Sequence, residues 1–251
     1  MFDPAYPERS DLHLHTTYSD GVDSIELMAR TAVMNRLELI AITDHMYSNL
    51  FMNGKTTGEY FDEIGEVSEK YPELKILKGV EGTLLSVDGE VSVPDREIGK
   101  FDIVLIDIAW KAKGIACEAP GNKVDLLNNI SRAFRNLCSN KNIDIIAHPF
   151  NFGRIVENFS FSLFSENFLQ EIAGHFIDGD KSFEIMNDIW WWFPELEPEE
   201  ITQEYARILK VFKDFGVKFT KGSDSHSHQG VGHSGYSDVL INTMHNKENA
   251  L

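Results

Sequence analysis

Two histidines one residue apart, His13 and His15, lie near the start of the chain in the stretch DLHLHTTYSDG at residues 11–21. In an extended segment, residues i and i+2 point to the same side of the backbone, so both imidazoles can face one ion. Asp20 follows closely enough to add a carboxylate. The pair alone is a modest indication of metal binding, and its weight depends on matching ligands elsewhere in the chain.

Four further segments carry ligand-type residues, each at or just past the end of a predicted strand. They are Asp44-His45, Glu81, His148 and Asp224/His226. Because the carboxyl ends of parallel barrel strands meet on one face, we expect these residues to form one cluster. Imidazole and carboxylate ligands suit Zn, Mn or Fe, and a set of this size favours two or three ions. Neighbouring divalent cations can clamp a phosphate and activate water, which indicates hydrolysis at phosphorus.

The elements that would position these residues alternate along the chain. We predict strands at 37–42, 74–80, 103–106, 143–147, 182–186 and 217–220, and helices at about 23–35, 59–70, 122–138 and 198–215. In the first of these helices, Asp23 is the expected N-cap. This alternation predicts an α/β fold with parallel strands joined by helical crossovers.

Three other segments complete the expected architecture. Residues 84–93 are expected to form a short strand or hairpin, 151–181 an elaborated loop with a helical piece, and the apolar run 239–241 the segment that closes the fold. No linker or internal repeat divides the chain, so a single domain over 1–251 is predicted.

Composition limits the function classes. The 251 residues carry a formal net charge of −17, which disfavours broad nucleic-acid binding. No apolar run is long enough for a membrane span, and the first residues lack a signal-peptide pattern, so a cytoplasmic location is expected. Cys117 and Cys138 are expected to be free thiols.

Taken together, five motifs resemble those of the PHP (polymerase and histidinol phosphatase) family and occur in that family's order. They are DLHLHTTYSDG at 11–21, TDH at 43–45, GVE at 79–81, AHP at 147–149 and SDSH at 223–226. The resemblance implies a distorted (β/α)7 TIM-like barrel with a two- or three-metal centre at the carboxyl ends of its strands. It also implies hydrolysis of phosphoesters.

Residue by residue, the resemblance implies a ligand set for each ion. His13, His15, Glu81 and Asp224 would bind the first ion, Asp20, His45 and His226 the second, and Glu81 with His148 the third. The family usually adds a histidine from the fourth strand to the third ion, but here Ala109 or Trp110 stands in that place. Asp107 lies on the same strand face one pleat earlier, and we expect it to be a structural acceptor rather than a ligand.

Four more residues are candidates for contact with the substrate. Asp44 and His228 could protonate the leaving group, and Arg154 and His233 could contact its phosphate. For the loop residues His228 and His233 a solvated surface position is the favoured alternative. For Arg154 a surface salt bridge is an alternative of equal weight. Asp44, like Asp11, could instead orient a histidine or bind metal itself.

The aromatic run at residues 190–193, Trp-Trp-Trp-Phe, has two interpretations. Core packing or a dimer contact is the expected role. The alternative is a stacking wall for a base or another flat substrate group.

The sequence therefore predicts a metal-dependent phosphoesterase that hydrolyses a small phosphomonoester, or a small phosphodiester, with metal-activated water. The substrate could be a nucleotide. One alternative is a histidinol-phosphate phosphatase. Another is a metal-binding regulatory module with weak turnover, which the absence of the fourth-strand histidine would favour. The oligomeric state is left open.

Overall fold

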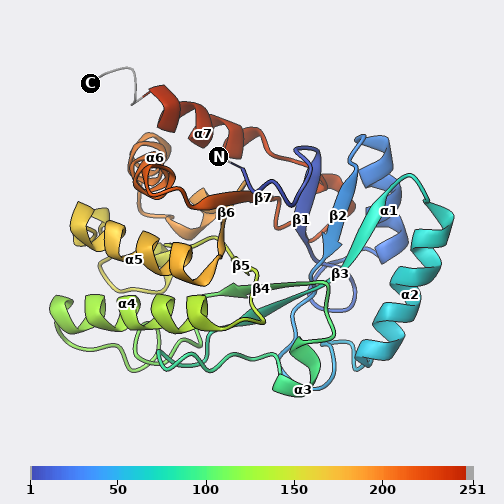
Figure 1. The fold of residues 1–251 in the computed structure, drawn as a ribbon, viewed down its shortest axis with the longest axis horizontal. Helices are drawn as coiled ribbons and strands as arrows, with labels where there is room; N and C mark the ends of the chain where they lie inside the picture. The colour runs from blue at the N-terminus through green and yellow to red at the C-terminus, as the bar shows by residue number, and fades with distance from the viewer. Residues whose placement is uncertain (1, 247–251) are drawn as a thin grey trace.

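Seven parallel strands, hydrogen-bonded in chain order, form the centre of the molecule (Figure 1). This computed structural model describes residues 2–246. The strands are β1 (Ser10–Leu14), β2 (Leu39–Ile42), β3 (Lys75–Thr83), β4 (Ile103–Asp107), β5 (Ile145–Ile146), β6 (Ser182–Met186) and β7 (Lys218–Gly222). Each strand neighbours the next in sequence, which is the order of a barrel built from successive strand–crossover units.

The first and last strands nearly close the barrel. Leu14 at the end of β1 pairs with Ser225 just beyond β7, and the His15 amide donates to the Ser225 carbonyl at 2.9 Å. At the opposite end, Phe2 pairs with Phe219 of β7. The predicted distorted (β/α)7 TIM-like barrel is thus confirmed.

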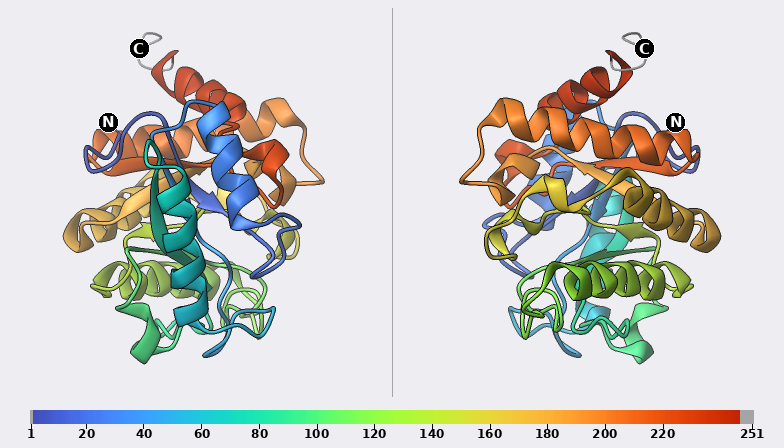
Figure 2. Two further views of the ribbon diagram at one scale, coloured as in Figure 1. Left: turned by 90° about the vertical axis from the view of Figure 1, so that its right-hand side faces the viewer. Right: turned by 90° about the vertical axis from the view of Figure 1, so that its left-hand side faces the viewer.

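Helices surround the sheet (Figures 1 and 2). They are α1 (Ile25–Met34), α2 (Thr57–Lys70), α3 (Asp95–Ile98), α4 (Lys123–Ser139), α5 (Glu166–Gly179), α6 (Pro198–Asp214) and α7 (Gly235–Asn246). Figure 2 shows α1 and α2 side by side on one side of the barrel, and α4, α5 and α6 stacked on the other. Short 3-10 turns η1 (Phe152–Arg154), η2 (Phe161–Leu163), η3 (Ile189–Trp192) and η4 (His228–Gly230) lie in the loops.

The structure refines or corrects four sequence-based expectations about these elements. The N-cap of α1 is Ser24, whose side chain accepts from the Leu27 amide, whereas Asp23 accepts from His228. Residues 151–181 contain the expected helical piece, which is the 14-residue crossover helix α5. The run 239–241 lies within α7 rather than in a segment of its own. The expected hairpin at 84–93 is reduced to one antiparallel bridge between Leu84 and Val91.

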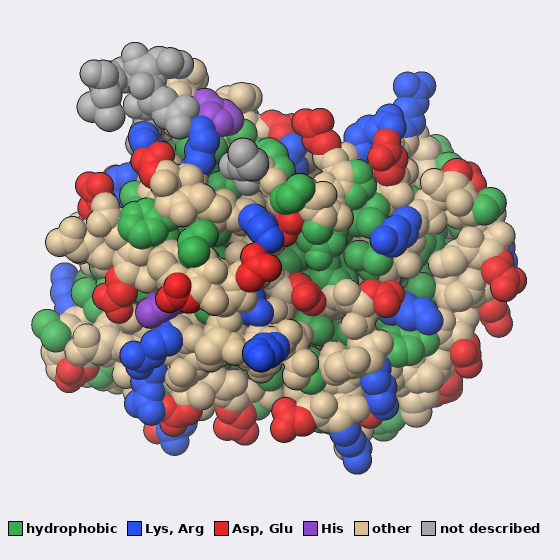
Figure 3. Space-filling view, in the orientation of Figure 1, with side chains coloured by type: hydrophobic (Ala, Val, Ile, Leu, Met, Phe, Trp, Pro, Cys, Tyr) green, Lys and Arg blue, Asp and Glu red, His purple; other side chains and the backbone are tan. Residues whose placement is uncertain are grey.

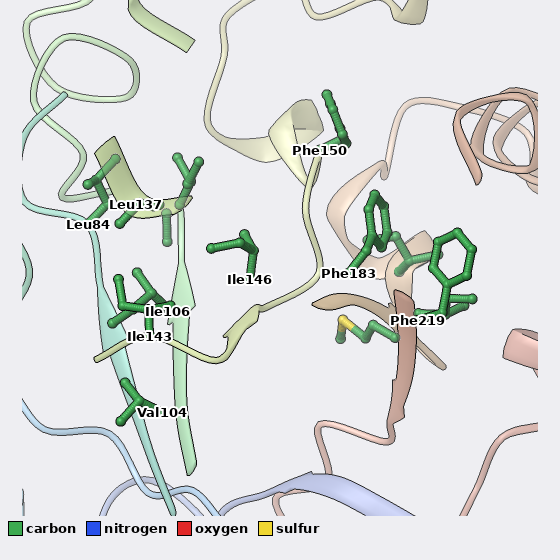
Figure 4. Packing of buried hydrophobic residues seen from close by; sticks show 14 of the residues in the cluster. Leu84, Val104, Ile106, Leu137, Ile143, Ile146, Phe150, Phe183 and Phe219 are labelled. Carbon is green, nitrogen blue, oxygen red and sulfur yellow. The ribbon is translucent and has the colours of Figure 1, made fainter. Parts of the chain in front are cut away.

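Apolar side chains form two clusters, one on each face of the sheet. The larger lies between strands and helices, and Figure 4 shows Val104, Ile106, Ile146 and Phe183 among its members. The smaller fills the barrel interior from alternate strand positions, and comprises Leu12, Leu39, Ala41, Leu77, Ile103, Leu105, Ile145 and Ala147. This alternation is the period-two pattern of strands buried on both faces.

A β-bulge in β1 changes which residues face the interior. Asp11 pairs with Ile40 and Leu14 with Ile42, so two residues of β1 stand opposite the single residue Ala41 of β2. Leu12 therefore joins the interior cluster, and His13 next to it also turns inward. Bulges commonly re-aim side chains next to active sites in this way.

The surface carries no single dominant charge on the face in view. Acidic and basic side chains are interspersed over the described part of that face in Figure 3. Among residues 2–246, no helix is long and apolar enough to cross a membrane. Both cysteines are free, with Cys117 exposed and Cys138 buried.

Candidate metal centre

Glu81 lies near the carboxyl end of β3, and its side chain neighbours four histidines. Its Oε2 lies 3.1 Å from His13 Nε2, 3.4 Å from His15 Nε2 and 3.1 Å from His45 Nδ1. Its Oε1 lies 3.5 Å from His148 Nε2. The carboxylate thus belongs to more than one group of ligand-type atoms.

The first group surrounds the His13–His15 pair. Both ring Nε2 atoms approach Glu81, and Asp224 Oδ1 lies 3.1 Å from His15 Nε2 and 3.5 Å from His13 Nε2. Asp224 adopts a φ of +53°, an uncommon backbone conformation for a residue with a side chain. Such conformations cluster at functional sites, where the surrounding structure holds them.

A second group of ligand-type side chains lies closer to solvent than the first group. Asp20 Oδ1 is 3.4 Å from His226 Nε2 and Asp20 Oδ2 is 3.8 Å from His45 Nε2. The His15 ring lies between the rings of His45 and His226, with centroids 4.5 and 4.4 Å away. One ligand atom from each of His15, Asp20, His45 and His226 lies within 4.8 Å of all the others.

The third group contains a residue whose role the sequence left in doubt. Ligand atoms of Glu81, His148 and Asp107 lie within 4.8 Å of one another. Asp107 is buried, and its Oδ1 has no hydrogen-bond partner within the described chain, so this oxygen is free to face a cation. Ala109 lines the same cavity and offers no ligand atom, so the family's fourth-strand histidine has no direct counterpart here.

The buried donor atoms of the cluster fit a metal centre. Within residues 2–246, several have no hydrogen-bond partner although carboxylate oxygens lie near. They are His13 Nε2, His15 Nε2, His45 Nδ1, Glu81 Oε1, His148 Nδ1 and Asp107 Oδ1. Buried polar atoms are rarely left unsatisfied. Four of these atoms, His13 Nε2, His15 Nε2, His45 Nδ1 and Glu81 Oε1, lie 3.1–3.5 Å from another ligand-type atom of the cluster. Mixed nitrogen and oxygen donors in this number match the chemistry of Zn, Mn or Fe.

Mutual electrostatics shift the pKa values of the cluster. Burial would raise the pKa of Glu81, but His13 and His45 outweigh it and hold that pKa well below its usual range. Burial would lower the pKa of His148, yet its contact with Glu81 raises it to about 9. Burial and the charge of Glu81 raise the pKa of Asp107 to about 6. The metal-free cluster therefore holds protons that binding cations would displace.

Glu184, at the middle of β6, orients the ring of His13 and holds the backbone of His148. Its Oε1 accepts from His13 Nδ1 at 2.9 Å, which directs the other ring nitrogen of His13 toward Glu81. Its Oε2 accepts from the His148 amide at 2.8 Å. Carboxylates behind ligating histidines fix ring orientation and tautomer in this way.

Gly222 at the end of β7 makes room for this support. A Cβ at this position would lie 2.0 Å from Glu184 Oε1 and 2.7 Å from His13 Cβ. We therefore expect Gly222→Ala to displace the Glu184 carboxylate and weaken metal affinity about 10–100-fold, the usual effect of losing such a supporting group. Metal titration of the purified variant measures this. Gly174→Ala is the matched control, because nothing lies within 4 Å of its added Cβ. Equal metal affinities for Gly222→Ala and wild type would contradict the role given to Glu184.

Asp11 and Asp44 position loops rather than reach the cavity. Asp11 accepts from the amides of Ser223 and Gly232, both beyond or at the end of β7. Asp44 accepts from the amides and hydroxyls of Thr16 and Ser19, at 2.7–3.0 Å. Asp44 thereby fixes the turn that presents Asp20.

The remaining predicted substrate residues lie outside the cavity that the cluster lines. His228 Nδ1 pairs with Asp23 at 2.8 Å. His233 lies beside Asp11 in a separate small pocket. Arg154 donates through Nε to the Trp191 carbonyl, and its guanidinium stacks 4.2 Å from the Trp191 ring centroid. Neither Asp44 nor these three side chains are among the described residues lining the cavity.

The cavity above the cluster has a volume of about 490 Å³. The lining residues that belong to the cluster are Asp20, His45, Glu81, Asp107, His148, Asp224 and His226. Tyr47, Ala109, Met186, Asp188 and four tryptophans complete the lining. This volume is typical of a small-molecule site.

Comparison with known proteins agrees with this architecture. A model of the PHP domain matches residues 11–219. The chain belongs to the PHP family. A probable phosphatase from Caldanaerobacter subterraneus subsp. tengcongensis is 33% identical over 142 residues, covering 56% of this chain and 52% of that protein. DNA polymerase/3'-5' exonuclease PolX from Bacillus subtilis is 32% identical over 144 residues, covering 56% of this chain but 23% of the polymerase.

Other relatives match over more of their length. A probable phosphatase from Thermoanaerobacter pseudethanolicus is 27% identical over 224 residues, covering 88% of this chain and 80% of that protein. Among solved structures, the fold is shared with histidinol phosphate phosphatase from Lactococcus lactis, a complex with zinc, L-histidinol and phosphate. That comparison has a TM-score of 0.65 and 20% identity, covering 94% of this chain and 93% of that one.

Proposed function

We propose that this PHP-family protein is a metal-dependent phosphoesterase that hydrolyses a small phosphomonoester, or a small phosphodiester. The observation that carries the proposal is the convergence on Glu81 of ligand-type side chains from separate strand ends, with buried donor atoms that lie close together and lack partners among the described residues. The phosphatase names of the relatives support the same class of reaction.

Three ions are proposed, held by the three groups of side chains. The first takes His13, His15, Glu81 and Asp224, the second Asp20, His45 and His226, and the third Glu81, His148 and Asp107. Asp107 would substitute for the histidine that the family usually places on the fourth strand. Asp44 is proposed as a positioning residue for Asp20, and His228 as one for the loop around Asp23.

Charge makes the proposed reaction depend on cations. Five carboxylates line the cavity, and none of the Lys or Arg side chains of residues 2–246 does. This acidic lining would repel a phosphate dianion. Bound divalent cations would neutralise the phosphate oxygens and lower the pKa of the attacking water. Glu184, Asp11 and Asp44 hold the metal-ligand side chains and their loops in place.

The test uses protein stripped with a chelator and reloaded with Zn, Mn or Fe, then assayed on a panel of phosphate esters. We expect no activity in the stripped protein, recovery with metal, and at least a ~10²-fold loss in His13→Ala, because loss of a ligand exceeds the effect of loss of an outer partner. His245→Ala is the control, since His245 is exposed on α7. Hydrolysis that persists without metal, or is unchanged in His13→Ala, would refute the proposal.

Two other functions give different results in the same assay. A histidinol-phosphate phosphatase would prefer histidinol phosphate to nucleotides when the two compete. A regulatory module would bind metal in stoichiometric amounts and hydrolyse no ester. The loss of the fourth-strand histidine favours the module only if Asp107 fails to replace it.

A further inference from the structure

One wall of the cavity is built from tryptophans supplied by two distant segments. Trp110 follows β4, and Trp190, Trp191 and Trp192 form the turn η3 after β6. These four residues, named here the tryptophan wall, all line the cavity beside the proposed metal ligands. Trp192 lies next to His148, with ring centroids 5.4 Å apart, so the wall begins directly at the centre.

Core packing explains only part of this aromatic run. Trp192 and Phe193 are 5% and 2% exposed, and Phe193 contacts Phe159 and Phe161. Trp110, Trp190 and Trp191 are 51%, 49% and 42% exposed. Large apolar rings left half open inside a concave site are characteristic of ligand recognition.

The rings form a surface with faces and edges that a flat group can contact. Trp110 lies 5.0 Å from Trp192 at an interplanar angle of 34°, and meets Trp191 edge-on at 6.1 Å. Two cations lie against lining rings: Lys111 is 3.6 Å from the Tyr47 centroid, and Arg154 stacks on Trp191. Neither cation lines the cavity. The tryptophan wall therefore offers stacking, with the exposed carboxylate of Asp188 at its edge.

We propose that the tryptophan wall is the subsite for the leaving group, and that the substrate is a phosphate monoester whose alcohol carries a flat ring and no further anionic group. This inference rests on the proposed phosphoesterase function. Stacking favours a ring. A second phosphate or a carboxylate is disfavoured by Asp188 and by the absence of Lys or Arg from the lining that residues 2–246 provide.

The test compares esters whose alcohols differ in the ring but have similar acidity. Benzyl phosphate and butyl phosphate are assayed with metal-loaded protein, together with 4-carboxybenzyl phosphate. We expect kcat/KM for benzyl phosphate to exceed that for butyl phosphate about tenfold, through a lower KM, and the added carboxylate to remove most of this advantage. Equal kcat/KM values for the benzyl and butyl esters would overturn the inference.

Variants assign the preference to the tryptophan wall. Trp190→Leu and Trp191→Leu are expected to reduce the ratio of benzyl to butyl kcat/KM about fivefold, and Trp191→Phe to restore much of it. Phe215→Leu is the control, because Phe215 is an exposed ring at the end of α6, outside the cavity. If the Leu variants slow both esters equally and change the size-exclusion elution, the tryptophan wall is a subunit contact and the inference is wrong.

A binding measurement separates this inference from the proposed function. Benzylphosphonate and butylphosphonate cannot be hydrolysed, so their affinities for metal-loaded protein report on the subsite alone. We expect about tenfold tighter binding of benzylphosphonate, weakened in Trp191→Leu. Absence of hydrolysis with retained ring selectivity would refute the phosphoesterase and keep the subsite. Hydrolysis without ring selectivity would support the phosphoesterase and refute the subsite.

Discussion

Replacement of Glu81 by Gln is expected to abolish hydrolysis and to remove most of the bound metal. Glu81 places one carboxylate oxygen within 3.4 Å of three histidines and the other 3.5 Å from a fourth. Glutamine keeps the shape but removes the negative charge and one acceptor oxygen. Two proposed ions would lose a ligand at once, so the loss in kcat/KM should exceed the ~10–100-fold effect of removing an outer partner.

Three measurements check this prediction. Elemental analysis should find few ions in Glu81→Gln, the assay should find no significant turnover, and added metal should raise its melting temperature less than that of the wild type. The control is Glu97→Gln, since Glu97 is also buried but pairs with Thr57 and Lys100 away from the centre. Full metal content in Glu81→Gln would contradict the central role of this carboxylate.

The sequence was sufficient to predict much of the barrel and of its metal cluster. Buried strands that end in ligand-type residues have a strong local signal, because apolar runs and terminal His or Glu are visible in one dimension. All eight side chains predicted as metal ligands lie together, including His148, whose partner was in doubt. The period-two rule also placed His13 and His15 on one side correctly.

Features set by tertiary packing were less predictable. The bulge in β1 turns both Leu12 and His13 inward, and nothing in an alternating pattern reveals an inserted residue. Ser24 and Asp23 are both good N-caps, and the contact of Asp23 with His228, 205 residues away, decided between them. A cluster of Phe and Asn obscured α5, and the run at 239–241 is too short to distinguish helix from strand.

The substrate contacts were the least predictable part. Arg154, His228 and His233 lie near motif residues in sequence, yet none of them lines the cavity. Arg154 stacks on the lining residue Trp191, His228 pairs with Asp23, and His233 lies in a separate pocket. The tryptophans that do line it come from the loops after β4 and β6, and only the barrel brings Trp110 against Trp192. Loop side chains are positioned by such long-range contacts rather than by a local pattern.

Asp107→Ala should bind about one ion fewer per chain and lose on the order of 10²-fold in kcat/KM. The reason is that the third group of ligand-type side chains would keep only Glu81 and His148. Zn, Mn and Fe sites normally use at least three protein donors, so two would hold the third ion poorly. Elemental analysis measures the ion count independently of the assay.

A second substitution in the same strand end makes this test specific. Ala109 lines the cavity two residues after Asp107, where the family usually carries its histidine. Ala109→His added to Asp107→Ala should restore the lost ion and much of the activity, since imidazole suits the same metals. Restoration would show that the loss came from a missing donor rather than from a disturbed fold. If Asp107→Ala retains every ion of the wild type, Asp107 is no ligand, and the structural role expected from the sequence is retained.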